Sequence, residues 1–165
     1  MAKTLHLVSL GCPKNLVDSE VMLAALEAEG YVVVEDPQQA EILMVNTCGF
    51  IQSAAEEAID EVLGLAAYKE DDAKKRLVVT GCLVQRYGQD LATTLPEVDL
   101  FVGLDDFPAI AQLLAEMDDN RRLFSQPGEA VYLMDSSVPR RLATPFFRSY
   151  LKITEGCDNR CSYCM

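Results

Sequence analysis

Apolar runs of strand length alternate with helical patterns through the first two-thirds of the chain, and this alternation constrains the fold most strongly. The runs cover residues 5–10, 31–34, 41–46, 77–80 and 100–103. Between them, apolar residues recur at helical spacing over 15–28, 55–66, 84–93 and 108–117. Ser53 and Glu56 predict a capping box before the second helix. Continuous apolar strands separated by helices predict an α/β fold with an open, doubly wound, mostly parallel sheet.

The alternation ends near residue 118, which predicts three parts in the chain. Residues 1–118 form the α/β domain. Residues 119–145 are polar, contain Pro and Gly turn signals, and are predicted to be a linker with a short strand at 131–133. A new strand is predicted at 149–154. Because one strand and a cysteine loop cannot build a core, residues 146–165 are expected to be the start of a truncated second domain.

Composition narrows the class of protein. No apolar run approaches the roughly 18 residues that cross a bilayer, and the N-terminus lacks a signal-peptide layout. We therefore expect a cytoplasmic protein without a membrane partner. The net charge of −12 disfavours nucleic-acid binding by this segment, and it suits either a basic protein partner or simple solubility. In a reducing compartment, the six cysteines are expected to be metal ligands or catalytic groups rather than disulfides.

Three cysteines that are remote in sequence occupy the same predicted structural position. Cys12, Cys48 and Cys82, here called the first triad, each follow a predicted strand directly and each have a glycine beside them. The carboxyl ends of parallel strands share one edge of a sheet, so we expect these cysteines to converge there. Three thiolates with one open position fit a [4Fe–4S] cluster. Separate buried cysteines, or a zinc site with a fourth ligand, are the alternatives. His6 is interpreted as a packed strand residue.

The other three cysteines, the second triad, form a C-x3-C-x2-C run made of Cys157, Cys161 and Cys164. Such close spacing lets one loop present three thiolates to a single cubane cluster and leaves the fourth iron open. A zinc knuckle is the alternative, although no fourth Cys or His follows in the chain. The spacing, with Tyr163 before the last cysteine, resembles the radical S-adenosylmethionine signature.

Two triads in this order, on a sheet domain followed by a barrel strand, resemble the radical S-adenosylmethionine methylthiotransferase family over the whole chain. Residues 9–20, 46–51, 80–87 and 151–157 are similar to its RimO-type branch, which modifies the β-carbon of an aspartate in a small-subunit ribosomal protein. The other branch modifies an adenosine beside the tRNA anticodon. That branch usually has Gln-Met in place of Pro13 and Lys14, and a small residue, Val and Arg after the second cysteine.

The resemblance implies two [4Fe–4S] clusters and S-adenosylmethionine as cofactors. The second triad would hold the cluster that cleaves S-adenosylmethionine, and the resulting radical would take a hydrogen from the aspartate β-carbon. The first triad would hold the cluster that carries the sulfur, which is methylated by another S-adenosylmethionine and then transferred. A basic ribosomal protein as substrate and a reducing electron donor are the implied partners.

Two other functions are kept beside this one. A tRNA adenosine methylthiotransferase would use the same cofactors, and a non-catalytic iron–sulfur or zinc module would use the cysteines without turnover. We also expect the 165-residue chain alone not to complete turnover, because most of the barrel that would hold S-adenosylmethionine and the substrate is absent.

Polar residues near the first triad have more than one interpretation. Asn46 and Thr47 either hydrogen-bond cluster sulfides or complete the strand and its turn, and we favour the second. Asp18 and Glu20 are interpreted as a solvated helix face. Gln85 and Arg86 face either substrate or solvent, and the sequence does not decide between them.

Overall fold

The computed structural model describes residues 3–72, 74–117, 123–124, 134–154, 156, 159 and 161–162. The strands are β1 (Thr4–Ser9), β2 (Val32–Val33), β3 (Ile42–Thr47), β4 (Arg76–Gly81), β5 (Leu100–Val102) and β6 (Leu123–Phe124). The α-helices are α1 (Pro13–Ala28), α2 (Gln52–Asp71), α3 (Cys82–Thr94) and α4 (Ile110–Glu116). Two single 3-10 turns, η1 (Pro37–Gln39) and η2 (Phe107–Ala109), complete the described elements.

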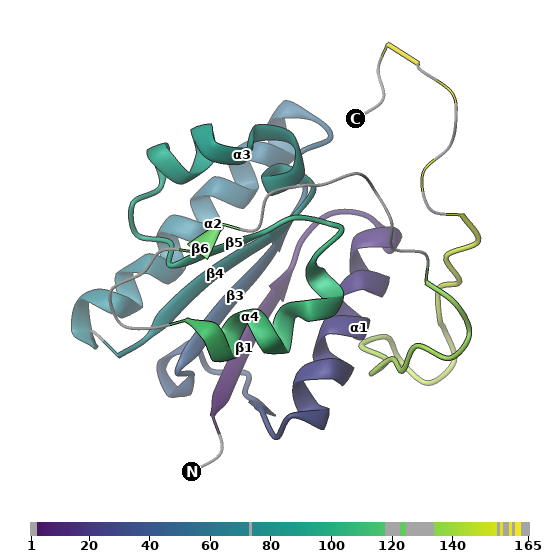
Figure 1. Cartoon of the computed structure of the whole chain (residues 1–165), viewed down its shortest axis with the longest axis horizontal. Helices are drawn as coiled ribbons and strands as arrows, with labels where there is room; N and C mark the ends of the chain where they lie inside the picture. Colours follow the sequence, from purple (N-terminus) through teal and green to yellow (C-terminus); the bar gives the residue numbers. More distant parts are fainter. Residues whose placement is uncertain are drawn as a thin grey trace.

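The strands form one sheet in the order β2-β1-β3-β4-β5-β6, and every neighbouring pair is parallel (Figure 1). Ser9 pairs with Asn46, and Asn46 pairs with Thr80, so β1, β3 and β4 end at nearly the same level. The strand order reverses between β1 and β3. In open α/β sheets, such a reversal opens a crevice at the carboxyl edge, where ligands bind.

Helices cover both faces of this sheet, which confirms the predicted α/β fold (Figure 1). Helices α2 and α3 pack on the face that carries Leu43 and Val45, whereas α1 and α4 pack on the face that carries Ile42 and Met44. Every residue of β3 is buried. A strand buried on both faces needs apolar side chains at odd and even positions, which is why β3 reads as a continuous apolar run.

Helix α2 begins differently from the prediction. Its N-cap residue is Ile51, whose carbonyl oxygen accepts hydrogen bonds from the backbone N–H groups of Ala54 and Ala55. Ser53 therefore already lies inside the helix, and the predicted capping box is wrong. Gln52 instead donates a side-chain hydrogen bond to Glu56 at 2.8 Å. No helix in the described ranges is both long enough and apolar enough to cross a bilayer.

The C-terminal part differs from the prediction in two further ways. Residues 149–154 form no strand, so that prediction is wrong. A strand needs a neighbouring strand to complete its ladder, whereas here the Tyr150 carbonyl accepts a side-chain hydrogen bond from Arg140 at 3.0 Å. The short strand β6 was not predicted, and the strand predicted at 131–133 lies outside the described residues. Residues 134–154, here called the docked segment, lie against α1 (Figure 1). Met134 and Val138 pack on the core.

The conformation of Gly81 generates a stability prediction. Gly81 has φ +101°, and a Cβ placed there would press against the Asn46 side chain and the Thr47 backbone. Gly81→Ala should lower the free energy of unfolding by at least about 2 kcal/mol, since it adds left-handed strain to overpacking. Gly64→Ala is the control, because Gly64 lies in α2 with nothing within 4 Å of the added Cβ. That variant should gain about 0.5–1 kcal/mol in urea denaturation. Equal midpoints for the two variants would contradict the packing described here.

Candidate metal centre

The first triad converges at the carboxyl edge of three adjacent strands. Cys12 follows β1 and is the N-cap residue of α1, Cys48 directly follows β3, and Cys82 directly follows β4 as the first residue of α3. Because β1, β3 and β4 are neighbours in the sheet, the three loops leave it side by side. Cys12 is exposed, and the other two are partly buried. The edge is therefore open to solvent on the side of Cys12.

Glycines let these loops pack against one another. Gly11 has φ +96°, and a Cβ at this position would lie 2.7 Å from the Cβ of Cys48. Gly49 approaches the first turn of α3, where an added Cβ would lie 3.0 Å from the Cα of Leu83. These contacts are between the loops themselves, and they bring the cysteines together.

The thiol of Cys82 shows that the three sulfurs share one electrostatic environment. Burial, followed by the charges of Cys48, Cys12 and Asp18 in that order, raises the pKa of Cys82 to about 11. The N-termini of α1 and α3, which begin next to Cys12 and at Cys82, favour negative charge at the same place. The negative charges of these neighbouring groups disfavour one another's ionisation. A bound cation would reduce this repulsion.

The donor set fits an iron–sulfur cluster better than a single ion. Among the described residues, no three His, Cys, Asp or Glu side chains are close enough to chelate one metal ion. A [4Fe–4S] cluster is larger than an ion and is held by cysteine thiolates, which is the donor type present here. The Nδ1 atom of His6 lies 3.2 Å from the Val34 carbonyl oxygen, away from the carboxyl edge. This contact supports the interpretation of His6 as a packed strand residue.

Two asparagines hold the loops of the triad in place. The Nδ2 atom of Asn15 donates to the Thr47 carbonyl oxygen at 3.1 Å and also to the carbonyl oxygen that follows β1. Asn46 Nδ2 donates to the Asn15 carbonyl oxygen and to Ser19 Oγ, and Thr47 Oγ1 donates to the Thr80 carbonyl oxygen at 2.6 Å. The donors of Asn46 and Thr47 are thus used within the protein, as the favoured interpretation predicted. Within the described residues, the Oδ1 atoms of both asparagines lack a hydrogen-bond partner.

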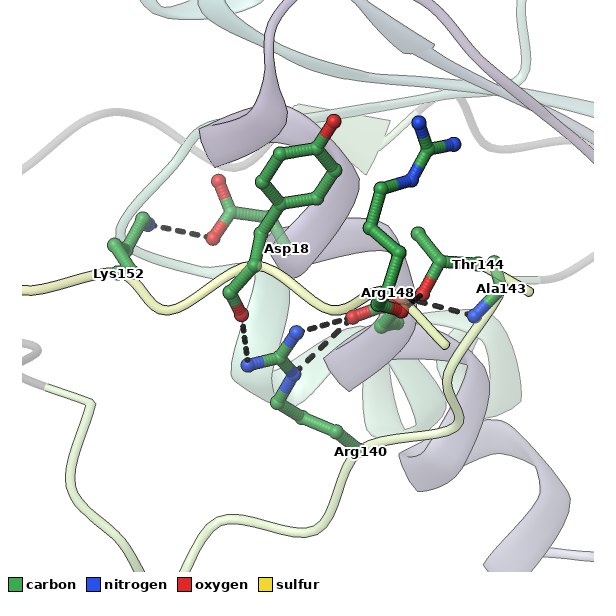
Figure 2. Close-up of polar contacts among 8 residues, drawn as sticks. Asp18, Arg140, Ala143, Thr144, Arg148 and Lys152 are labelled. Atoms are coloured by element: carbon green, nitrogen blue, oxygen red, sulfur yellow. Dashed lines mark hydrogen bonds and ion pairs between the residues drawn. The ribbon is translucent and has the colours of Figure 1, made fainter. Parts of the chain in front are cut away.

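Asp18 and Glu20 were expected on a solvated helix face, and that interpretation is wrong. Both are buried, because the docked segment covers this side of α1. Asp18 pairs with Lys152 at 2.6 Å, and Glu20 pairs with Arg140 (Figure 2). No sequence signal links these residues, since their partners lie more than a hundred positions away.

A groove of about 540 Å³ lies next to the first triad, between α2 and α3. Phe50, Ile51 and Tyr87 line it and are exposed. Arg86 also lines the groove, and its Nη1 atom donates to the Gly49 carbonyl oxygen at 2.9 Å. Arg86 therefore binds the loop that carries Cys48, a structural role that the sequence did not distinguish from substrate or solvent contact.

Comparison with known proteins agrees with this arrangement. Residues 4–103 match the model of a family described as uncharacterized protein family UPF0004. The match begins at β1 and ends just after β5, so it contains the whole first triad. The chain belongs to this family of α/β domains.

Curated relatives are similar over nearly the whole chain. The chain is 51% identical to the ribosomal protein uS12 methylthiotransferase RimO of Syntrophus aciditrophicus, over 98% of its length. It is 53% identical to the protein of the same name from Desulfotalea psychrophila, over 97% of its length, and 48% identical to that from Geobacter sulfurreducens, over 96%. The chain spans only 36% of the length of each of these relatives.

The environment of Cys82 generates a prediction about thiol reactivity. In the metal-free chain, alkylation of Cys82 by iodoacetamide should reach half of its full rate near pH 11. A thiol that is buried and surrounded by other acidic groups holds its proton to higher pH, and only the thiolate reacts. Cys48→Ala should shift this midpoint to lower pH, because it removes one of those groups. The rates can be followed by mass spectrometry of each cysteine peptide. A Cys82 midpoint near the ordinary value of about 8.5 would contradict the convergence of the triad.

Proposed function

We propose that this chain is part of a methylthiotransferase that adds a methylthio group to the β-carbon of an aspartate in a small-subunit ribosomal protein. The observation that carries the proposal is the convergence of Cys12, Cys48 and Cys82 at one sheet edge. The names of the relatives, which are about half identical to the chain, support the choice of a ribosomal protein as substrate. The proposal concerns the whole protein, since the chain spans about a third of those relatives.

We assign the cofactor ligands by triad. The first triad would hold one [4Fe–4S] cluster, and Cys157, Cys161 and Cys164 would hold another that binds S-adenosylmethionine. Bound in this way, the clusters would supply a reducing electron for S-adenosylmethionine and an open iron that carries sulfur. Cys161 is exposed, and the other two members of the second triad lie outside the described residues.

The chain's own residues have three tasks in this function. The Asn15 and Asn46 side chains hold the loops of the first triad at fixed positions. The N-termini of α1 and α3 favour the ionised thiols that bind metal. Partial burial of Cys48 and Cys82 limits the access of water to the site, while the exposure of Cys12 leaves one side open to a substrate.

The acidic surface supports a basic partner. The net charge of −12 would attract a basic ribosomal protein and would repel the phosphates of a nucleic acid. This is why we place the tRNA-modifying function second. A reducing electron donor and a cytoplasmic location complete the proposal, since both clusters and free thiols require a reducing compartment.

Metal analysis tests the assignment of the first triad. After anaerobic reconstitution, the chain should contain about eight irons and about eight acid-labile sulfides. The Cys12/Cys48/Cys82→Ala variant should retain about four of each, because one cubane loses its ligands. His6→Ala is the matched control and should leave the iron content unchanged, since His6 lies away from the site. Zinc without sulfide, or the same iron content in the triple variant, would leave a metal-binding module in place of the proposed enzyme.

A further inference from the structure

We propose that two ion pairs, Asp18–Lys152 and Glu20–Arg140, form a positioning clamp that sets where the second triad lies relative to the first. This inference rests on the proposed function, because only a two-site enzyme needs the two triads at a fixed separation. Both carboxylates belong to α1, and both cations belong to the docked segment (Figure 2). The clamp therefore joins the α/β domain to the chain that leads into the second triad.

The pair nearer to the cysteines is deeply buried. Lys152 Nζ lies 2.6 Å from Asp18 Oδ1, and the two side chains are only 4% and 6% exposed. Burying a charge is costly unless the opposite charge and hydrogen bonds accompany it. The buried Asp18 carboxylate on α1 therefore needs a cation beside it, and the docked segment supplies Lys152.

The second pair is part of a larger set of contacts. Arg140 donates to Glu20 from Nε at 3.2 Å and also from Nη2, and its Nη1 atom donates to the Tyr150 carbonyl oxygen at 3.0 Å. The other carboxylate oxygen of Glu20 accepts from the Ala143 backbone N–H at 2.9 Å. Arg140 thus connects α1 to a residue only two positions before Lys152, so the two ion pairs hold both ends of residues 140–152.

Polar contacts, rather than apolar burial, hold the C-terminal end of the docked segment. Leu151 and Ile153, which flank Lys152, are 81% and 84% exposed. Burial of these side chains against α1 therefore contributes little to docking. Ion pairs with hydrogen bonds have directional geometry, so they select one register of the segment on the helix, whereas apolar contacts tolerate sliding.

The clamp connects the first triad to the part of the chain that leads to the second triad. Asp18 lies in the second turn of α1, whose N-cap residue is Cys12. On the other side, Lys152 precedes Cys157 by five residues, a stretch of chain that spans at most about 18 Å when fully extended. Docking of Lys152 on Asp18 therefore limits how far the second triad can lie from the first.

A third ion pair between the same helix and the same segment provides a matched control. Arg141 and Glu27 lie 3.1 Å apart, but both side chains are 41% exposed. An exposed pair of this kind contributes little, because water solvates both charges when it breaks. Arg140 and Arg141 are sequence neighbours, and replacing either one removes a single positive charge. Comparing the two variants therefore distinguishes loss of the clamp from a general effect of lost charge.

Hydrogen exchange tests whether the clamp docks the segment. In this 165-residue chain, Lys152→Met and Arg140→Met should each speed exchange of the protected amides in residues 140–154 by about a hundredfold. Arg141→Met should change it by less than about threefold, and Lys152→Arg should restore most of the protection. Amides of β3 and β4 should stay protected in every variant, since the sheet does not depend on the segment. If Lys152→Met also exposes the sheet, Arg140→Met decides the test.

Cross-linking tests whether docking also sets the distance between the triads. Cys12 and Cys161 are both exposed, so both can react with a short bismaleimide in the metal-free chain, and a closed clamp should hold them within its reach. Lys152→Met and Arg140→Met should lower the yield of this link about tenfold relative to wild type and to Arg141→Met. If exchange becomes faster but the cross-link yield is unchanged, the ion pairs stabilise docking without setting the distance between the triads. If exchange is also unchanged, the ion pairs do not dock the segment and the proposal is wrong. Neither readout requires iron, so a chain that binds no cluster would overturn the proposed function while these results still decide the clamp.

Discussion

Hydrogen bonds between Asn15 and Asn46 are the interaction on which the rest of this site depends. Asn15 lies in the first turn of α1, and Asn46 lies near the end of β3, at the point where the strand order reverses. Each side chain donates to the backbone beside the other. Because Gly81 packs directly on Asn46, the same contact also determines how closely the loop with Cys82 approaches. Three cysteines from three separate loops thus share one buried polar junction.

Helix α1 connects the parts of the molecule that carry chemistry. One side packs in the core through Val21, Met22 and Leu26. Its N-terminal end follows Cys12, and a further side presents the two carboxylates that bind the docked segment. A helix that is buried on several sides at once cannot have a simple apolar stripe. For this reason charged residues that look like a solvent face in sequence are buried in the structure.

The positions of the charges explain how an acidic chain can build a site around thiols. The negative charges of Cys48, Cys12 and Asp18 disfavour ionisation of Cys82. Such repulsion favours binding of a cation at the site. The Lys152 ammonium neutralises the charge of Asp18, and the thiols remain available to bind metal. The Cys82 thiol and the Lys152 ammonium therefore both interact with the charge of Asp18.

The sequence by itself determined the α/β class, the parallel sheet and the grouping of the first triad. Strands buried on both faces are mostly apolar, as residues 42–45 of β3 are, and residues that follow such parallel strands meet at one edge. Only the tertiary structure decided the first turn of α2, the absence of a strand at 149–154, and the burial of Asp18 and Glu20. These features depend on pairings between residues more than a hundred positions apart, such as Glu20 with Arg140, or on how a loop enters its helix. Local patterns carry periodicity and turn chemistry, but they carry no information about which distant cation will neutralise a buried carboxylate.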